Sequence, residues 1–130
     1  YMIKFGIDIP ISTKICPGLY IGHFGNITVS YLASIGKNCN LSPGITIGAI
    51  YRGARSGAPT IGNNVYIGPG AKIIGKVNVG NNVAIGANCV VTRDIPDNAV
   101  VVGVPGRVIS FKGSTGYILN VKSDDIKNQL

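Results

Sequence analysis

The sequence predicts an all-β fold in which the chain coils into a parallel β-helix, and a six-residue repeat is the main reason. One apolar residue returns at every sixth position from Ile61 to Val91, and a second series of small or branched residues, from Val65 to Cys89, runs four places behind it. A glycine follows most members of the first series. Neither a helical period of 3.6 nor a strand period of two produces a repeat of six, whereas a short strand followed by a tight corner does.

The same repeat can be followed through the earlier part of the chain. After a lead-in, the first series runs from Ile9 to Ile21, and its next member in phase is Val29, eight places on. Two extra residues therefore lie in this turn, directly after His23. The series then continues to Ile47. Because three six-residue walls make one triangular turn, we expect about four turns and a closing segment.

The repeat is interrupted between residues 48 and 60 and ends after Val91. The interruption contains two arginines and has no period, which predicts a loop that protrudes from the coil. The prolines and turn-forming residues after Val91 predict the segment that closes the last turn, since a solenoid must cover its terminal core. We therefore expect a β-helix domain over residues 1–110 with a protruding loop at 48–60, and a short C-terminal tail at 111–130.

The composition narrows the classes of function. Twelve basic and five acidic residues give a net charge of +7, which favours an anionic partner. The sequence has no basic tract interleaved with aromatic residues, so it does not indicate that this partner is nucleic acid. No apolar run is long enough to insert stably in a membrane. Three cysteines without a CxxC motif predict reduced thiols and a cytoplasmic chain. The start at Tyr1 rather than Met predicts either a trimmed chain, with sequence missing upstream, or the remnant of a tag.

His23 is the single histidine, and it lies beside the two-residue insertion. Bulges in β-structure redirect side chains and are frequent near active sites, and the flanking glycines allow a substrate to approach closely. Asp8 lies fifteen residues upstream, close to one turn earlier, where its carboxylate would hold the imidazole in one tautomer. A catalytic pair and two structural residues are equally compatible with this spacing.

Five segments, GIDIP, GLYIGHFGN, IGKNCNLSPGITIGA, IGNNVYIGPGAKIIG and GVPGR, resemble in this order the serine acetyltransferase-like branch of the hexapeptide acyltransferases. The resemblance covers residues 6 to about 110. It implies a left-handed β-helix, a homotrimer, and transfer of an acetyl group from acetyl-CoA to a hydroxyl without a metal. It also implies that His23 is the general base and that Asp8 is its partner.

The resemblance implies further binding residues around a groove between subunits. The pantetheine arm of CoA would lie against the backbone at Gly48, Ala49, Gly68 and Ala87, and the CoA phosphates would meet Lys72 and Arg107. The acceptor would face Tyr51, Arg52 and Arg55 of the protruding loop. For the charged residues, an ordinary solvated surface is the alternative interpretation.

The sequence departs from serine acetyltransferases where the acceptor would be held. Gly57 and Ala58 replace an Arg-His pair of that family, and Gly22 replaces the aspartate before the catalytic histidine. These departures predict a sugar hydroxyl of a capsular or exopolysaccharide precursor as the acceptor, as in polysaccharide O-acetyltransferases. The alternatives are a serine O-acetyltransferase and a non-catalytic β-helix scaffold. A zinc hydratase on this fold would need three histidines to bind the metal, and the sequence contains one, so this class is excluded.

Overall fold

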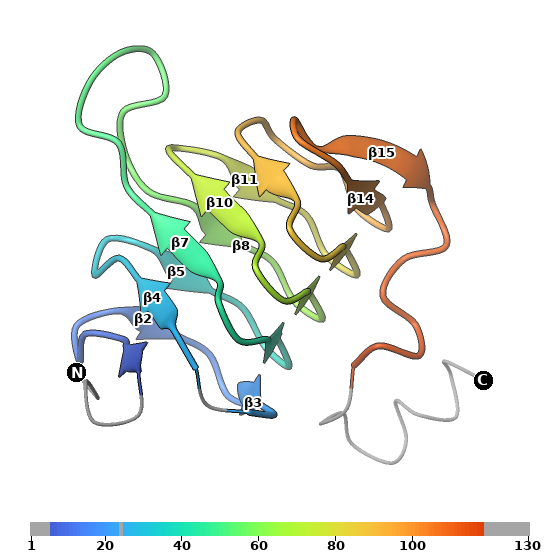
Figure 1. Cartoon of the computed structure of the whole chain (residues 1–130), viewed down its shortest axis with the longest axis horizontal. Coiled ribbons are helices and arrows are strands. Elements are labelled where there is room, and N and C mark those ends of the chain that lie inside the picture. Colours follow the sequence, from blue (N-terminus) through green and yellow to red (C-terminus); the bar gives the residue numbers. More distant parts are fainter. Residues whose placement is uncertain (1–5, 24, 119–130) are drawn as a thin grey trace.

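The computed structural model describes residues 6–23 and 25–118, and every regular element within them is a short β-strand. The strands stack into three walls that meet at corners, so the chain winds as a triangular coil (Figure 1). These residues contain no helix that is long and apolar enough to cross a membrane.

The three walls take their strands from successive turns of the coil. Wall A contains β1 (Ile7–Asp8), β4 (Ile27–Val29), β7 (Thr46–Gly48), β10 (Lys72–Ile74) and β13 (Val90–Val91). Wall B contains β2 (Lys14–Ile15), β5 (Ser34–Ile35), β8 (Thr60–Ile61) and β11 (Asn78–Val79). Wall C contains β3 (Tyr20–Ile21), β6 (Asn40–Leu41), β9 (Tyr66–Ile67), β12 (Ala84–Ile85), β14 (Val100–Val102) and β15 (Arg107–Ser110). We call the connections between walls corners AB, BC and CA, in chain order.

The register of the walls confirms the six-residue repeat and its interruptions. Thr60 lies opposite Asn78, eighteen residues later, which is the length of a regular turn of three repeats. The first turn is two residues longer, as the insertion after His23 predicts, because Lys14 lies opposite Ser34. The protruding loop lengthens the third turn. The closing turn is shorter than a regular one, and β15 then folds back antiparallel to β14.

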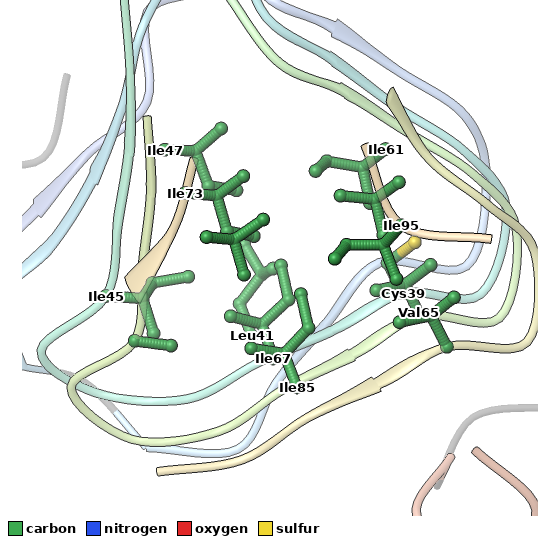
Figure 2. Packing of buried hydrophobic residues seen from close by; sticks show 14 of the residues in the cluster. Cys39, Leu41, Ile45, Ile47, Ile61, Val65, Ile67, Ile73, Ile85 and Ile95 are labelled. Carbon is green, nitrogen blue, oxygen red and sulfur yellow. The ribbon is translucent and has the colours of Figure 1, made fainter. Parts of the chain in front are cut away.

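The interior of the coil is filled by both apolar series, as predicted. Figure 2 shows their side chains stacked in columns along the axis, for example Leu41, Ile67 and Ile85. Where a glycine follows a strand, the stacking can require it: a Cβ atom at Gly62 would lie 2.6 Å from the carbonyl oxygen of Gly80 in the next turn. Each buried aliphatic side chain contributes about 1.5–3 kcal/mol by leaving water.

Corner BC is joined from turn to turn by a ladder of side-chain hydrogen bonds. The backbone N–H of Lys37 donates to Oδ1 of Asn63 at 2.8 Å, and the N–H of Asn63 donates to Oδ1 of Asn81 at 2.8 Å. The N–H of Asn81 in turn donates to Oδ1 of Asp97 at 2.7 Å. These bonds satisfy backbone N–H groups that do not take part in the hydrogen bonds within the walls. Corner BC therefore keeps the same shape in four successive turns of the coil.

The C-terminal strap, residues 111–118, runs back along the outside of wall C (Figure 1). Ser114 Oγ donates to the carbonyl oxygen of Asn64 at 2.6 Å, and Asn40 Nδ2 donates to that of Tyr117 at 2.9 Å. The ring of Tyr117 packs 5.1 Å from that of Tyr66. The strap therefore covers outward-facing residues of β6 and β9. The rest of the predicted tail, residues 119–130, lies outside the described residues.

We expect the three cysteines to differ strongly in reactivity. Cys39 and Cys89 are buried among the core residues, as predicted, whereas Cys16 is exposed. Burial raises the pKa of the Cys39 thiol to about 11 and also raises that of Cys89, so little thiolate is present at neutral pH. A thiol reagent should label one cysteine quickly in the native protein and the other two only on unfolding.

The Cys16→Ser variant is the control, because it should remove the fast phase. Fast labelling of the native variant would contradict the burial of Cys39 and Cys89.

The raised thiol pKa also has a consequence for stability. The unfolded thiol ionises near pH 9.0, so the contribution of the buried Cys39 thiol is complete below that pH and declines as the pH rises towards 11.

Candidate functional site

His23 lies at corner CA, two residues after the end of β3, and its side chain is exposed. It lines a hollow of about 340 Å³ together with Ile7, Ile21 and Gly22. Ile7 precedes Asp8 on β1, and the side chain of Asp8 is exposed on the same wall. The structure thus brings β1 and the histidine corner together within one turn of the coil, and it leaves the imidazole outside the core.

A second hollow lies on the other side of His23, against wall C. This corner pocket has a volume of about 180 Å³ and is lined by Tyr20, Gly22, His23, Asn40, Leu41, Ser42, Pro43 and Tyr66. Of these residues, only His23 was predicted from the sequence to take part in a site. The pocket arises because β3, β6 and β9 stack directly in wall C, which aligns the outward side chains of Tyr20, Asn40 and Tyr66.

The residues predicted to contact the pantetheine arm lie at two different corners. Gly68 and Ala87 are at corner CA, in later turns than His23, and the N–H of Gly68 already donates to the carbonyl oxygen of Ile85 at 2.8 Å. Gly48 and Ala49 are at corner AB, where the protruding loop begins. Wall A separates these two corners within the chain.

Lys72, predicted to meet a CoA phosphate, is held against corner CA. Its Nζ donates to the carbonyl oxygens of Gly44 at 2.7 Å and Gly70 at 2.9 Å. Both carbonyls belong to glycines with positive φ, at 77° and 75°, which turns these oxygens towards the ammonium group. Lys72 therefore places a positive charge at corner CA, which also carries His23. Two hydrogen bonds fix the position of the ammonium group.

Arg107 lies at the closing end of the coil beside a basic residue that the sequence did not single out. A hollow of about 600 Å³ is lined there by Arg93, Arg107, Val91, Thr92, Ile95 and the segment from Gly103 to Gly106. Arg93 follows the last regular strand of wall A and is exposed, as is Arg107. Two guanidinium groups around one hollow form a site suited to phosphate groups.

The protruding loop leaves corner AB far from the β3–β4 connection (Figure 1). Tyr51 and Arg52 are exposed in the loop. Arg55, predicted to face the acceptor, is instead engaged with its own chain: its Nη1 donates to Oδ1 of Asp94 at 3.1 Å and to the carbonyl oxygen of Lys76 at 3.2 Å. The Arg55–Asp94 ion pair is a latch that ties the base of the loop to the last turn.

In the Arg55→Ala variant, we expect the amide hydrogens of the protruding loop to exchange with solvent several-fold faster than in the wild type. The melting temperature should not change. The pair is exposed, and such pairs order a segment locally without supporting the whole fold. Hydrogen exchange followed by mass spectrometry would measure this, with Arg52→Ala as the matched control. Equal exchange in wild type and Arg55→Ala would contradict the latch.

The latch should also respond to acid. A hydrogen bond from the N–H of Asn78, together with the nearby Arg55 guanidinium, lowers the pKa of Asp94 below its ordinary value of 3.8. Because the folded pKa is lowered, the contribution of this carboxylate is complete above about pH 4 and is lost as the pH falls through the lowered value. The loop should therefore stay latched at neutral pH.

Among residues 6–23 and 25–118, no group of three or more His, Cys, Asp or Glu side chains is arranged to hold a metal ion. The two hollows beside His23 are lined by phenol, hydroxyl and amide groups as well as apolar side chains, so they can hold a polar substrate next to the imidazole.

Comparison with known proteins identifies the class to which this coil belongs. The family model "Bacterial transferase hexapeptide (six repeats)" matches residues 58–93. The chain belongs to this hexapeptide-repeat transferase family, and the similar structures described below support the predicted left-handed β-helix.

Within that family, the chain is similar to serine acetyltransferases. It is 38% identical to the serine acetyltransferase of Synechococcus elongatus over 83% of this chain and 44% of that protein. The structure of Brucella abortus serine acetyltransferase in complex with coenzyme A matches with a TM-score of 0.77 and 33% identity, over 84% of this chain and 44% of that chain. The Neisseria gonorrhoeae serine acetyltransferase in complex with serine matches with a TM-score of 0.74 and 32% identity, over the same shares.

These comparisons correct the prediction about the acceptor. The prediction of a sugar hydroxyl, and with it a role in polysaccharide biosynthesis, was wrong, because the matching relatives and structures are serine acetyltransferases. The error has a physical origin: Gly57 and Ala58 remove one way of holding an acceptor, but two small residues do not specify a different ligand. The chain spans less than half the length of the Synechococcus relative.

Proposed function

We propose that this chain carries an acetyl-CoA-dependent serine O-acetyltransferase activity, with His23 as the general base. The observation that carries the proposal is the position of His23: it is an exposed imidazole on a glycine-flanked corner, between two hollows, in a coil similar to a serine acetyltransferase with serine bound. The similarity to a relative in complex with coenzyme A supports acetyl-CoA as the donor.

The reaction needs one proton acceptor and one place for a developing negative charge. His23 takes the proton of the serine hydroxyl as that oxygen attacks the thioester carbonyl carbon of acetyl-CoA. A backbone N–H at Gly48 or Ala49 stabilises the oxyanion of the tetrahedral intermediate. The C–S bond then breaks, and the CoA thiolate recovers the proton from the imidazolium. The products are O-acetylserine and CoA. Asp8 orients the imidazole.

A homotrimer completes this site. His23 and Lys72 lie at corner CA, whereas Ala49 and the loop lie at corner AB, so one chain does not bring them together. In a trimer, corner AB of one chain lies beside corner CA of the next, and the pantetheine arm occupies the groove between them. Lys72, Arg93 and Arg107 then meet the CoA phosphates. Tyr51 and Arg52 of the neighbouring loop face the acceptor, with Arg52 on its carboxylate.

Thiol release from acetyl-CoA tests the proposed function. The purified chain is incubated with acetyl-CoA, with or without L-serine, and free CoA is measured with a thiol reagent. We expect release to depend on L-serine and not on L-alanine, which lacks the hydroxyl but is otherwise matched. A folded chain with equal release in the presence of either amino acid would contradict the proposal.

A further inference from the structure

The corner that carries His23 differs from the corners of the later turns in its backbone hydrogen bonds. In those turns, the residue after a wall C strand donates its N–H to a carbonyl oxygen of the next turn over 2.8–3.2 Å, as Ser42, Gly68 and Gly86 do. Gly22 occupies this position in the first turn, and its N–H has no such backbone partner among the described residues. The backbone beside His23 must therefore be fixed in another way.

The ring of Tyr20 lies over the backbone of Gly22. If Gly22 carried a Cβ atom, the nearest heavy atoms outside its chain neighbours would all belong to Tyr20: Cε2 at 3.0 Å, the phenol oxygen at 3.5 Å and Cζ at 3.6 Å. Gly22 does not have a positive φ, so the ring, and not backbone strain, is the obstacle to a larger residue. Tyr20 lies on the outward face of β3 and is 37% exposed, so it does not belong to the core.

A second ring supports the other side of the same corner. A Cβ atom at Gly25 would lie 2.9 Å from Cβ of Pro43, which belongs to the next turn. His23 thus lies between two glycines, and each of them is packed against a ring. Tyr20 and Pro43 also line the corner pocket together with His23. The two contacts hold the corner on both sides of His23 and leave its side chain exposed.

From this arrangement we infer that Tyr20 is a positioning residue: its ring holds the backbone at Gly22 and thereby orients the His23 imidazole. The inference rests on the proposed function, in which His23 is the general base. A general base must lie within hydrogen-bond reach of the proton that it takes, about 2.6–3.2 Å, so the orientation of the imidazole affects the rate. A carbon atom of the ring makes the closest contact, so the phenol hydroxyl is not needed for this role.

Steady-state kinetics of Tyr20→Ala and Tyr20→Phe test this role. Tyr20→Ala should lower kcat for serine-dependent thiol release about 10- to 100-fold, because a catalytic group displaced by about 1 Å can lose this much. The KM for acetyl-CoA should not change. Tyr20→Phe keeps the ring and should keep the kcat of the wild type. Equal losses in the two variants would overturn the inference in favour of a hydroxyl that acts on the substrate, and an unchanged kcat in Tyr20→Ala would also overturn it.

Phe111→Ala is the matched control for the removal of an aromatic ring. Phe111 is 65% exposed in the C-terminal strap and lines neither hollow beside His23. This variant should keep the kcat of the wild type. A loss as large as that in Tyr20→Ala would show that removing any exposed ring has the same effect, and it would overturn the inference.

The Gly22→Ala variant tests whether Tyr20 acts through its contact with Gly22. On its own it should lower kcat, because the added methyl group displaces the ring of Tyr20. In the Tyr20→Ala background the same methyl group has room, so the two losses should not add. Additive losses would overturn the inference. An unchanged kcat in Gly22→Ala would overturn it as well, even if Tyr20→Ala did not fold.

A measurement on the imidazole itself separates the inference from the proposed function. The sequence contains one histidine, so a chain with isotope-labelled histidine gives one set of ring signals in NMR spectra. We expect equally restricted ring motion in the wild type and Tyr20→Phe, and motion of larger amplitude in Tyr20→Ala. Equal motion in all three proteins would overturn the inference. A wild type without serine-dependent thiol release would instead refute the proposed function, and the role of Tyr20 in the reaction with it, even if the imidazole moved as expected.

Discussion

The His23→Ala variant should lose at least about 100-fold in serine-dependent thiol release, because a positioned general base contributes roughly 10²–10⁴-fold to a rate. Without the imidazole, the serine hydroxyl keeps its proton as it approaches the thioester. The variant should fold normally, since His23 is exposed and does not belong to the buried cluster. Steady-state kinetics and a thermal melt of the same preparation would measure both expectations.

The Asp8→Asn variant is the matched comparison for His23. The asparagine side chain keeps the shape of the carboxylate and loses the charge that we propose orients the imidazole. We expect a smaller loss than in His23→Ala, because an orienting group acts only through the base. Near-normal turnover of His23→Ala would reject the histidine as the base, whatever the result at Asp8.

The Ile73→Ala variant should lower the free energy of unfolding by about 2–5 kcal/mol. Ile73 is 0% exposed and stands in the column between Ile47 and Val91 in wall A, so a truncated side chain leaves a cavity between two adjacent turns. Backbone bonds that join the turns on either side keep the cavity from closing. Urea unfolding at a constant protein concentration would measure the loss.

Ile11→Ala is the control for the core prediction. Ile11 is 93% exposed, so the same truncation should change the free energy of unfolding by no more than about 0.5 kcal/mol. Equal losses in the two variants would contradict the assignment of the apolar series to the interior of the coil.

The fold could be predicted from the sequence because the physical cause is local and repeated. Each repeat places one aliphatic residue inside and most repeats place a glycine after it, and the close approach at Gly62 shows why that glycine cannot be replaced. The insertion after Ile21 and the excursion after Gly48 were visible as breaks in this period. Both lengthen a turn without changing the pairing of the strands on either side.

The candidate site was predicted only in part, because its other residues depend on contacts between distant segments. Asn40 and Tyr117 are 77 positions apart, and no period links the strap to β6. The pairing of Arg55 with Asp94 likewise joins residues 39 positions apart. Arg93 lies beyond the last regular strand, where the repeat no longer indicates which residues lie close together. In contrast, His23 was found because an interruption of the repeat lies next to it.

The most direct test of the account is a crystal structure of the chain with CoA and L-serine bound. We predict the serine hydroxyl within hydrogen-bonding distance of a His23 ring nitrogen, about 2.6–3.2 Å, in a groove between two copies of the chain. Serine bound away from His23, or a groove formed without a second copy, would contradict the central claim.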